Sequence, residues 1–357
     1  MKKIFYIAAM LWAACSAVAI ACTGITLKSG DGSYIVARTI EWGNSSLNSG
    51  YVVVPRGYVQ DALTPDGLGG KQLVAKYGYV GLTVEQKEFV TEGINEAGLS
   101  AGLFYFPGYG EYETYDAGLR QATVTDLQLV AWMLGGFSTV DEVKEAIDGI
   151  HVVGIVPQAS TAHWRIADAS GRQVVLEITG GKPCFYENSL GVLTNSPGFE
   201  WQMTNLNNYV NLYPGNVNGQ DRNGLSLRPF GAGAGMLGLP GDVTPPSRFV
   251  RAAFYQSTAP VLATARETVV QCFHILNNFD IPVGLEHAIG DVPAGLPSAT
   301  QWTSATDITG RMIYYRSAWN MSVRCIDLKT INFGKVKFQY HPLEKTLEQP
   351  VEMIKVS

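Results

Sequence analysis

The chain has 357 residues, 46% of them hydrophobic and 16% charged, which is the composition of a folded globular protein and excludes an intrinsically disordered one. Its formal net charge of −5 excludes a protein that binds nucleic acid through an overall excess of basic residues. The 39 glycines and 17 prolines indicate a turn-rich fold, and five cysteines are too few for a disulfide scaffold.

Residues 1–21 have the pattern of a secretory signal peptide. Lys2 and Lys3 precede an apolar run over residues 4–14, and small residues lead to an A-x-A cleavage site that ends at Ala21. The run is short for a membrane span of about 20 residues, so we expect cleavage after Ala21 rather than an N-terminal anchor. No later segment reads as a membrane span, and we expect the mature protein to be exported, either periplasmic or secreted.

Cleavage after Ala21 makes Cys22 the first residue of the mature chain and removes Cys15 with the leader. Three interpretations of Cys22 are open at this point. It is an acylated lipoprotein cysteine, a small buried residue, or an N-terminal nucleophile. Lipoproteins usually have leucine three residues before the acylated cysteine, where this sequence has Ala19.

Residues 22–27 and 34–42 both read as β-strands, and the segment between them is rich in glycine, serine and aspartate. This pattern is typical of a β-hairpin. A two-residue turn at either of two possible centres makes Cys22 face Thr39 or Glu41. The hairpin therefore predicts that charged residues of the second strand lie close to the new N-terminus.

Arg38 and Glu41 are the charged residues of this second strand. A guanidinium beside a thiol lowers the pKa of the thiol, and a carboxylate can hold an α-amine that serves as a base near neutral pH. The ordinary alternative is a surface ion pair. Because the two residues are three apart, a regular strand points them to opposite faces, so we expect only one to reach the thiol unless the strand is irregular.

The rest of the chain alternates between helical and strand patterns. Helices are predicted over 124–134, from Thr139 with Glu142 completing a capping box, over 249–256 and over 263–276. Strands are predicted over 161–168, 172–178, 184–187, 191–195, 299–308, 311–318 and 321–328. Short connections between successive strands imply antiparallel pairing. The pattern indicates an α+β fold, without the glycine motif of a dinucleotide site.

Four sequence blocks occur in a recognisable order. They are Cys22-Thr23-Gly24, Ala37-Arg38-Thr39-Ile40-Glu41-Trp42, Leu193-Thr194-Asn195-Ser196-Pro197, and Gly241-Asp242 followed by Ser247-Arg248-Phe249-Val250-Arg251. Together they resemble the choloylglycine hydrolases, which are the bile salt hydrolases and penicillin V acylases of the N-terminal nucleophile superfamily. The resemblance extends from Cys22 to about Phe338. It implies a four-layer αββα fold with two antiparallel sheets, and a single catalytic domain over residues 22–357.

The resemblance implies that Cys22 is both nucleophile and base. Its α-amine takes the thiol proton, the thiolate attacks an amide carbonyl, and water then hydrolyses the thioester. Arg38 matches the family arginine beside the cysteine, and Glu41 stands where the family usually has aspartate. Arg248 matches the family arginine that follows a serine, although the pattern alone makes it a surface residue near the start of a helix capped by Ser247.

Two further residues match family positions that stabilise the oxyanion. Asn195 lies where a predicted strand ends before a proline, and the pattern alone makes it a turn residue. Tyr105 aligns with the second position, where bile salt hydrolases often have asparagine and penicillin V acylases often have tyrosine. Tyr105 is otherwise a pocket-wall aromatic residue, in a group with Trp42, Phe104, Phe106, Tyr109 and Tyr112.

No metal or other cofactor is expected, because no histidine pair and no cysteine pair has metal-site spacing. His163 reads as a structural histidine. Cys184, Cys272 and Cys325 read as buried thiols, and one disulfide among them stays open. The family often forms tetramers, so the resemblance implies a homo-oligomer, and the glycine-rich segment 230–236 reads as a pocket-edge or assembly loop.

The leading interpretation is an exported amidase that cleaves glycine- or taurine-conjugated bile acids through a Cys22 thioester. The second is a penicillin V acylase or a related N-acyl amidase, which Tyr105 favours. The third is a lipid-anchored envelope binding protein. The first two exclude the third chemically, because acylation of the Cys22 amine removes the base.

Overall fold

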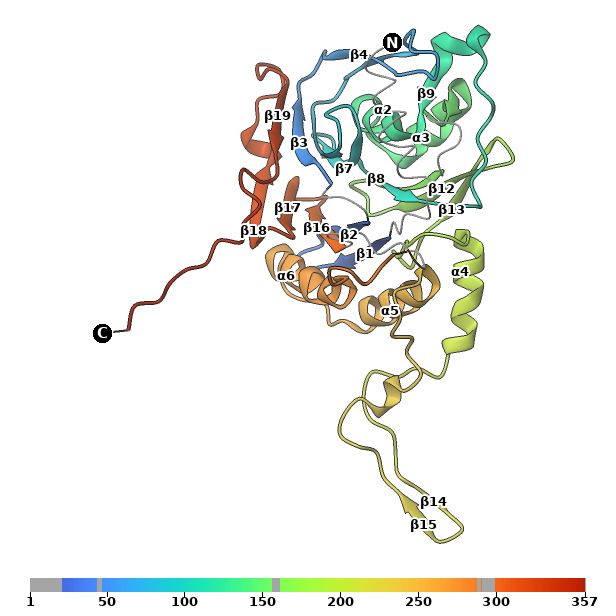
Figure 1. The fold of residues 1–357 in the computed structure, drawn as a ribbon, viewed down its shortest axis with the longest axis vertical. Coiled ribbons are helices and arrows are strands. Elements are labelled where there is room, and N and C mark those ends of the chain that lie inside the picture. The colour runs from blue at the N-terminus through green and yellow to red at the C-terminus, as the bar shows by residue number, and fades with distance from the viewer. Residues whose placement is uncertain (1–20, 44–46, 156–160, 288–289, 291–298, 357) are drawn as a thin grey trace.

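The structure is a computed structural model that describes residues 21–43, 47–155, 161–287, 290 and 299–356. The predicted signal peptide lies outside the described residues, apart from Ala21. Two antiparallel β-sheets stacked face to face form the centre of the molecule, and helices cover their outer faces (Figure 1). This arrangement confirms the predicted four-layer α+β fold.

The smaller central sheet has five strands in the order β1-β2-β16-β17-β18. Its first two strands are the predicted hairpin, in which alternate side chains face the other sheet and the helices. The strands are β1 (Cys22–Lys28), β2 (Tyr34–Trp42), β16 (Ala299–Asp307), β17 (Met312–Ser317) and β18 (Asn320–Asp327). The N-terminal hairpin is thus joined to three strands from the end of the chain, which places Cys22 inside the molecule.

The larger sheet has eight strands in the order β13-β12-β11-β8-β7-β6-β3-β19. Every neighbouring pair in it is antiparallel, as the short predicted connections required. The strands are β3 (Ser49–Val54), β6 (Tyr79–Val84), β7 (Val90–Asn95), β8 (Ser100–Tyr105), β11 (Ala162–Ala167), β12 (Gln173–Thr179), β13 (Lys182–Glu187) and β19 (Gln339–Pro342).

Helices form the two outer layers. On the eight-stranded sheet lie α2 (Leu129–Gly136) and α3 (Val140–Ala146), and on the five-stranded sheet lie α5 (Pro245–Thr258) and α6 (Ala265–Leu276) (Figure 1). The N-terminus of α6 carries a full capping box between Thr264 and Glu267. One apolar core fills the space between the sheets and under α5 and α6, and a second lies between the larger sheet and α2 and α3.

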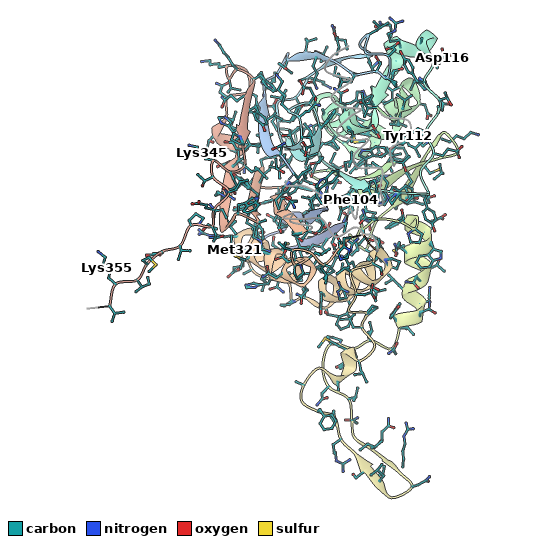
Figure 2. All side chains as sticks on the ribbon, in the orientation of Figure 1. Phe104, Tyr112, Asp116, Met321, Lys345 and Lys355 are labelled. Carbon is teal, nitrogen blue, oxygen red and sulfur yellow. The ribbon has the colours of Figure 1, made fainter. Side chains whose placement is uncertain are left out.

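The remaining elements are short and lie at the periphery. The helices are α4 (Phe199–Asn205) and the 3-10 segments at Ala117–Ala122, Asp126–Gln128, Ile147–Gly149, Leu206–Tyr209, Ala234–Met236, Asn277–Phe279 and Leu328–Thr330. The strands are β4 (Val59–Asp61), β5 (Gln72–Val74), β9 (Thr123–Thr125), β10 (His151–Val153), β14 (Gln220–Arg222) and β15 (Leu225–Leu227). Figure 2 places Phe104 near the centre of the body and Lys355 on a C-terminal tail that leaves it.

The register of the N-terminal hairpin differs from both predicted alternatives, because Cys22 pairs with Ile40. The predictions assumed a two-residue turn, whereas the loop between the paired residues Lys28 and Tyr34 has an odd number of residues and centres on Asp31. The carboxylate of Asp31 accepts a hydrogen bond from the backbone N–H of Ser33 within this loop. The resulting register puts Cys22 and Arg38 on one face of the sheet.

Three other predicted elements differ from the structure. Helix 124–134 begins only at Leu129, because the β-branched residues Thr123–Thr125 pair with β10 as a parallel strand. The strand predicted over 191–195 is a single bridge between Gly24 and Leu193. The helix predicted over 249–256 starts earlier, at Pro245, whose fixed φ suits a first helical position.

In the part of the chain that the structure describes, no helix is long and apolar enough to cross a membrane.

Candidate active site

Cys22 lies at the start of β1 and is buried, with 2% of its surface exposed. The described residues include Ala21, which is joined to Cys22 by a peptide bond. The Ala21 carbonyl accepts a hydrogen bond of 2.9 Å from the backbone N–H of Glu41 on the neighbouring strand. The hairpin therefore holds the predicted cleavage site and the predicted nucleophile in a fixed place.

Arg38 contacts the Cys22 thiol from the space between the two sheets. Its Nη2 lies 2.8 Å from Sγ of Cys22, and its Nη1 donates to the carbonyl of Leu103 on β8. The guanidinium also lies over the ring of Phe104, with 4.1 Å to the ring centroid. These contacts orient a fully buried cation toward the sulfur, as the sequence predicted.

Burial nevertheless raises the pKa of the Cys22 thiol above its ordinary value, and Arg38 offsets only part of this effect. Arg248 and a hydrogen bond from the Tyr105 backbone N–H also lower this pKa, whereas Glu41 raises it. The predicted lowering of the thiol pKa by a guanidinium is therefore correct for the Arg38 contact, but the net pKa of the Cys22 thiol is raised. Formation of a thiolate at this position therefore needs a base that takes the thiol proton.

Asn195 connects the backbone of Cys22 to two other predicted site residues. Its Oδ1 accepts hydrogen bonds of 2.8 Å from the backbone N–H of Cys22 and from Nη2 of Arg248. Its Nδ2 donates to the carbonyl of Tyr105 at 2.7 Å. Two donors face one end of the amide and an acceptor faces the other, so the surroundings fix the orientation of this side chain.

Arg248 lies on the helix side of the hairpin and is fully buried, which corrects the surface position that its helix pattern suggested. Its Nη1 donates to the carbonyl of Cys22 and to Oγ1 of Thr23. The helix α5 begins three residues before Arg248, which brings the guanidinium under the start of β1. The N-cap of this helix is Thr244, and Ser247 instead donates to Asp242.

Glu41 faces away from the thiol, so only Arg38 of the two charged strand residues reaches the sulfur. Its Oε1 accepts a hydrogen bond of 3.1 Å from Oγ1 of Thr300. Burial raises the pKa of Glu41 to about 8, although Arg248 lowers it. The sequence left open whether an irregular strand brings both Arg38 and Glu41 to the thiol. In the structure the strand is regular here, and the two side chains point to opposite faces of the sheet.

Tyr105 ends β8 and meets the site with its backbone. Its N–H points at the Cys22 thiol, and its carbonyl accepts from Asn195. A backbone donor beside the sulfur lies where negative charge develops when a thiolate attacks a carbonyl. The backbone N–H of Tyr105 and Nδ2 of Asn195 are therefore the two groups that suit an oxyanion.

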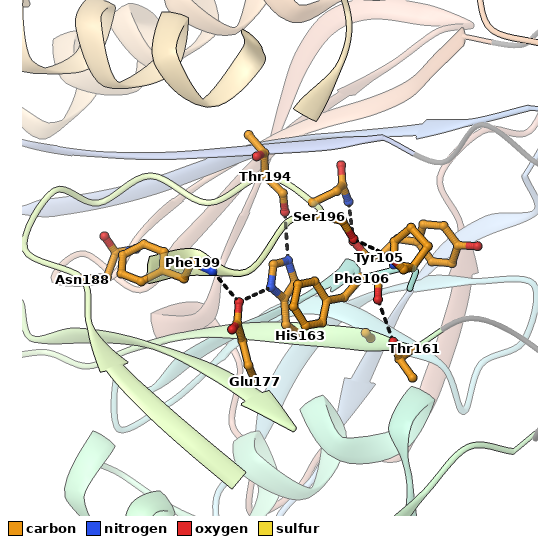
Figure 3. A network of polar contacts seen from close by, with 12 residues as sticks. Tyr105, Phe106, Thr161, His163, Glu177, Asn188, Thr194, Ser196 and Phe199 are labelled. Carbon is orange, nitrogen blue, oxygen red and sulfur yellow. Dashed lines mark hydrogen bonds and ion pairs between the residues drawn. The ribbon is translucent and has the colours of Figure 1, made fainter. Parts of the chain in front are cut away.

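His163 holds the segment that carries Asn195, and Figure 3 shows it between Glu177 and Thr194. Its Nε2 lies 2.9 Å from the carbonyl oxygen of Thr194, and its Nδ1 lies 3.2 Å from Oε1 of Glu177. Phe106 stacks on the imidazole with 4.3 Å between the ring centroids. The predicted structural histidine thus supports the site from behind.

Sequence reasoning missed three buried charged residues near the site. Glu177 contacts His163, and Glu92 forms an ion pair with Arg165 behind Arg38. No local pattern marks them, because each lies in an apolar strand and finds its partner on another strand. Their signal in the sequence is a lone charged residue inside a strand that is otherwise buried.

The predicted aromatic wall divides into core and surface residues. Phe104 and Phe106 are fully buried, and the hydroxyl of Tyr112 accepts from the backbone N–H of Ala162 at 2.7 Å. Tyr109 is 54% exposed. These aromatic residues therefore serve packing as much as a ligand wall.

The four cysteines in the described residues are free thiols. Cys272 is buried as predicted, but Cys184 is half-buried and Cys325 is exposed, which corrects the expectation of three buried thiols. Both lie on strands at the edges of their sheets, where the outer face has less cover. Among the described residues no group of three or more histidine, cysteine, aspartate or glutamate side chains could hold a metal ion.

Comparison with known proteins agrees with this fold. A structure of a mutant conjugated bile acid hydrolase from Clostridium perfringens matches with a TM-score of 0.80 at 29% identity, and the match covers 94% of this chain and 100% of that one. A penicillin V acylase from Agrobacterium tumefaciens shares the fold with a TM-score of 0.70 at 23% identity, over 88% of each chain. The architecture is that of the N-terminal nucleophile hydrolases.

The sequence comparisons narrow this class to one family. The family model for linear amide C–N hydrolases of the choloylglycine hydrolase family matches residues 22–340. A bile salt hydrolase/transferase from Clostridium perfringens is 31% identical over 335 residues, which are 91% of this chain and 98% of that protein. The chain therefore belongs to the choloylglycine hydrolase family, and it is a hydrolase of linear amide C–N bonds.

Proposed function

We propose that this protein is an exported cysteine amidase that hydrolyses the amide bond of glycine- or taurine-conjugated bile acids. The observation that carries the proposal is the environment of Cys22, whose thiol meets Arg38 and whose backbone N–H meets Asn195. A buried thiol with a cation on one side and two oxyanion donors nearby suits acyl transfer. The similarity to bile salt hydrolases supports the substrate class.

Cleavage after Ala21 converts the backbone N–H of Cys22 into an α-amine beside Oδ1 of Asn195. This amine takes the proton from the thiol, whose pKa is raised by burial, and the thiolate attacks the amide carbon. The oxyanion accepts hydrogen bonds from the backbone N–H of Tyr105 and from Asn195. The C–N bond breaks, the leaving amine takes the proton, and water hydrolyses the thioester to the free acid.

Penicillin V hydrolysis is the second candidate activity. A penicillin V acylase from Pectobacterium atrosepticum is 27% identical to this chain, over 89% of this chain and 84% of that protein. Tyr105 also favours this candidate, because penicillin V acylases often have tyrosine at the matching position. The carbonyl chemistry is the same for both substrates, so the acyl pocket decides between them.

A product assay with taurocholate, glycocholate and penicillin V tests the proposal, with wild type, Cys22→Ser and Cys325→Ser side by side. The exposed Cys325 is a matched thiol control outside the site. We expect wild type and Cys325→Ser to release taurine and glycine, and Cys22→Ser to release little of either. Absence of taurine and glycine release by the wild type would refute the bile salt assignment. Full activity of Cys22→Ser would refute the thiol mechanism.

Export and cleavage form a separate part of the proposal. The burial of Cys22 within β1 supports a processed nucleophile over a lipid-anchored cysteine, because an acyl chain on its amine needs an open path to a membrane. Intact mass and N-terminal sequencing of the exported protein test this part. We expect a chain that begins at Cys22 without modification, and a lipid adduct on Cys22 would contradict it.

We also propose that the protein forms a homo-oligomer, as the family resemblance suggests. Residues 210–240 form an arm that extends away from the body between α4 and α5 (Figure 1). Exposed apolar residues on this arm include Val210, Tyr213, Leu225, Phe230 and Leu237. Light scattering tests the proposal with the double variant Leu225→Ser/Phe230→Ser and the control Met321→Ser, an exposed apolar residue on β18. Only the arm variant is expected to dissociate, and a monomeric wild type would contradict the proposal.

A further inference from the structure

A second pair of buried charges lies directly behind Arg38. Glu92 on β7 and Arg165 on β11 are each 1% exposed, and Nη2 of Arg165 donates to Oε1 of Glu92. The other carboxylate oxygen of Glu92 lies 3.8 Å from Nη1 of Arg38. A continuous line of charges therefore runs from the Cys22 thiol through Arg38 and Glu92 to Arg165.

This arrangement is costly for the folded protein. In the described residues, Nε and Nη1 of Arg165 are buried without a hydrogen-bond partner. Buried ion pairs can often be replaced by apolar residues without loss of stability, so stability alone does not explain three buried charges here. Gly102 on β8 makes the arrangement possible, because a Cβ at this position would lie 2.2 Å from Oε2 of Glu92.

The formal charges explain what the pair can do for the thiol. Arg38, Glu92 and Arg165 together carry one net positive charge when Cys22 is a neutral thiol, and the group becomes neutral when Cys22 is a thiolate. Glu92 opposes the field of Arg38, and Arg165 opposes the field of Glu92. Glu92 and Arg165 must therefore shift the pKa of the Cys22 thiol in opposite directions. Glu92 raises this pKa and Arg165 lowers it.

We propose that Glu92 and Arg165 are positioning residues that set, through Arg38, the charge that the Cys22 sulfur faces. Glu92, 3.8 Å from the guanidinium of Arg38, weakens the field of that cation, and Arg165 holds Glu92 in place and limits the weakening. The inference rests on the proposed function only in taking Cys22 as the reactive thiol. It adds two residues to the reaction that touch neither the sulfur nor the substrate.

Arg38 from β2 and the N–H of Tyr105 from β8 face the sulfur, and Glu41 from β2 and Arg248 from α5 act on its pKa from the opposite face of the hairpin. None of them is altered in the test, and the α-amine of mature Cys22 titrates together with the thiol in every variant. The measured quantity is therefore the apparent pKa of the thiol–amine pair. A difference between variants isolates the contribution of Glu92 and Arg165.

The experiment measures the pH dependence of Cys22 alkylation by iodoacetamide in Glu92→Gln, in Arg165→Met and in the double variant. Peptide mass spectrometry separates Cys22 from the other thiols, and no substrate is needed. We expect the apparent pKa to fall by about one unit in Glu92→Gln and to rise by about one unit in Arg165→Met. The double variant is expected to return close to the wild-type value, because the two removed charges cancel.

Charge-conserving variants separate electrostatics from packing. Glu92→Asp and Arg165→Lys are expected to keep the wild-type pKa, and Glu96→Gln, which breaks the exposed ion pair with Arg56, is expected to leave it unchanged. If one single variant fails to fold, the double variant and the other single variant still have to differ by about one unit. Shifts in the same direction, or no shift, would overturn the proposal.

The outcome is distinguishable from a failure of the proposed function. A wild type that shows the expected alkylation profile but releases no amine from conjugated bile acids contradicts the substrate assignment, while the opposite shifts still support the role of Glu92 and Arg165. If the wild type releases the amine but all variants have the same alkylation profile, the proposed function still stands. The inference about Glu92 and Arg165 is then wrong.

Discussion

Two buried arginines approach Cys22 from opposite faces of the same hairpin, and they do different work. Arg38 lies between the two sheets and contacts the sulfur, whereas Arg248 belongs to α5 and contacts the backbone carbonyl of Cys22. Arg248 also holds Asn195, which binds the backbone N–H of Cys22. The comparison shows that the alternation of a β-strand lets the fold place one cation against the Cys22 thiol and another against the Cys22 backbone.

The two faces also balance their charges differently. On the sulfur face, Arg38 is accompanied by the Glu92–Arg165 ion pair. On the helix face, Arg248 lies near the carboxyl of Glu41, and burial raises the pKa of Glu41 to about 8. Near neutral pH the helix face therefore holds a carboxyl group that is largely protonated.

Removal of the sulfur is the strongest test of the comparison. We expect Cys22→Ala to lower kcat/KM for the hydrolysed substrate by about 1,000-fold or more, because neither arginine can replace a nucleophile. The measurement is amine release by the wild type and the variant, with circular dichroism as the test of folding. Activity within tenfold of the wild type would contradict the assignment of Cys22.

Replacement of each arginine by methionine tests whether the two faces are independent. We expect Arg38→Met to raise the apparent thiol pKa and to lower kcat/KM by about 100-fold, because the cation beside the sulfur is lost. In Arg248→Met we expect a smaller pKa shift and a larger fall in Tm, because a carbonyl and Asn195 lose their donor. Alkylation profiles measure the thiol pKa, thermal melts measure Tm, and amine release measures kcat/KM. Identical alkylation profiles for Arg38→Met and Arg248→Met would contradict the comparison.

His163 tests the support of Asn195 without touching the sulfur. We expect His163→Phe to lower kcat by about tenfold, because the carbonyl of Thr194 loses its donor and Asn195 loses its fixed position. The alkylation profile of Cys22 should stay at its wild-type position. A shifted profile would show that His163 acts on the thiol rather than on the oxyanion side.

Glu41 gives the smallest expected effect on activity and a defined effect on stability. Its pKa rises from an ordinary 4.5 to about 8 on folding, so the folded protein holds a proton that the unfolded chain releases between these values. The stability of the wild type therefore falls as pH rises through this window. Relative to wild type, Glu41→Gln should gain up to about 1.4 kcal/mol per pH unit.

Urea unfolding of the wild type and Glu41→Gln at pH 5 and pH 8 measures this difference. Glu85→Gln is a suitable control, because Glu85 is a carboxylate near the protein surface that contacts Asn48. Parallel pH profiles for wild type and Glu41→Gln would contradict the buried, protonated carboxyl.

The sequence pattern was sufficient for the residues that lie in local motifs and for the α+β class, and the family resemblance supplied the four layers. The contact between Cys22 and Arg38 was predictable because one hairpin brings the two residues together within a short stretch of chain. The hairpin register was wrong because a two-residue turn was assumed, whereas the loop centres on Asp31. Arg248 needed the family resemblance, since its helix pattern alone suggested the surface.

Glu92, Arg165 and Glu177 could not be predicted, because their partners come from other strands. Glu92 meets Arg165 two strands away in the larger sheet, and it meets Arg38 only across the space between the sheets. Side-chain alternation in one strand does not specify what the opposite sheet presents. Such charges become interpretable only when the stacking of both sheets is known.

The most direct test of the account is the mass of the N-terminal peptide after acid quenching of the mature enzyme during turnover of glycocholate. The account predicts a peptide that begins at Cys22 and carries the cholyl group as a thioester on the sulfur. Release of glycine with the cholyl group on another residue, or from a chain that begins before Cys22, would contradict it.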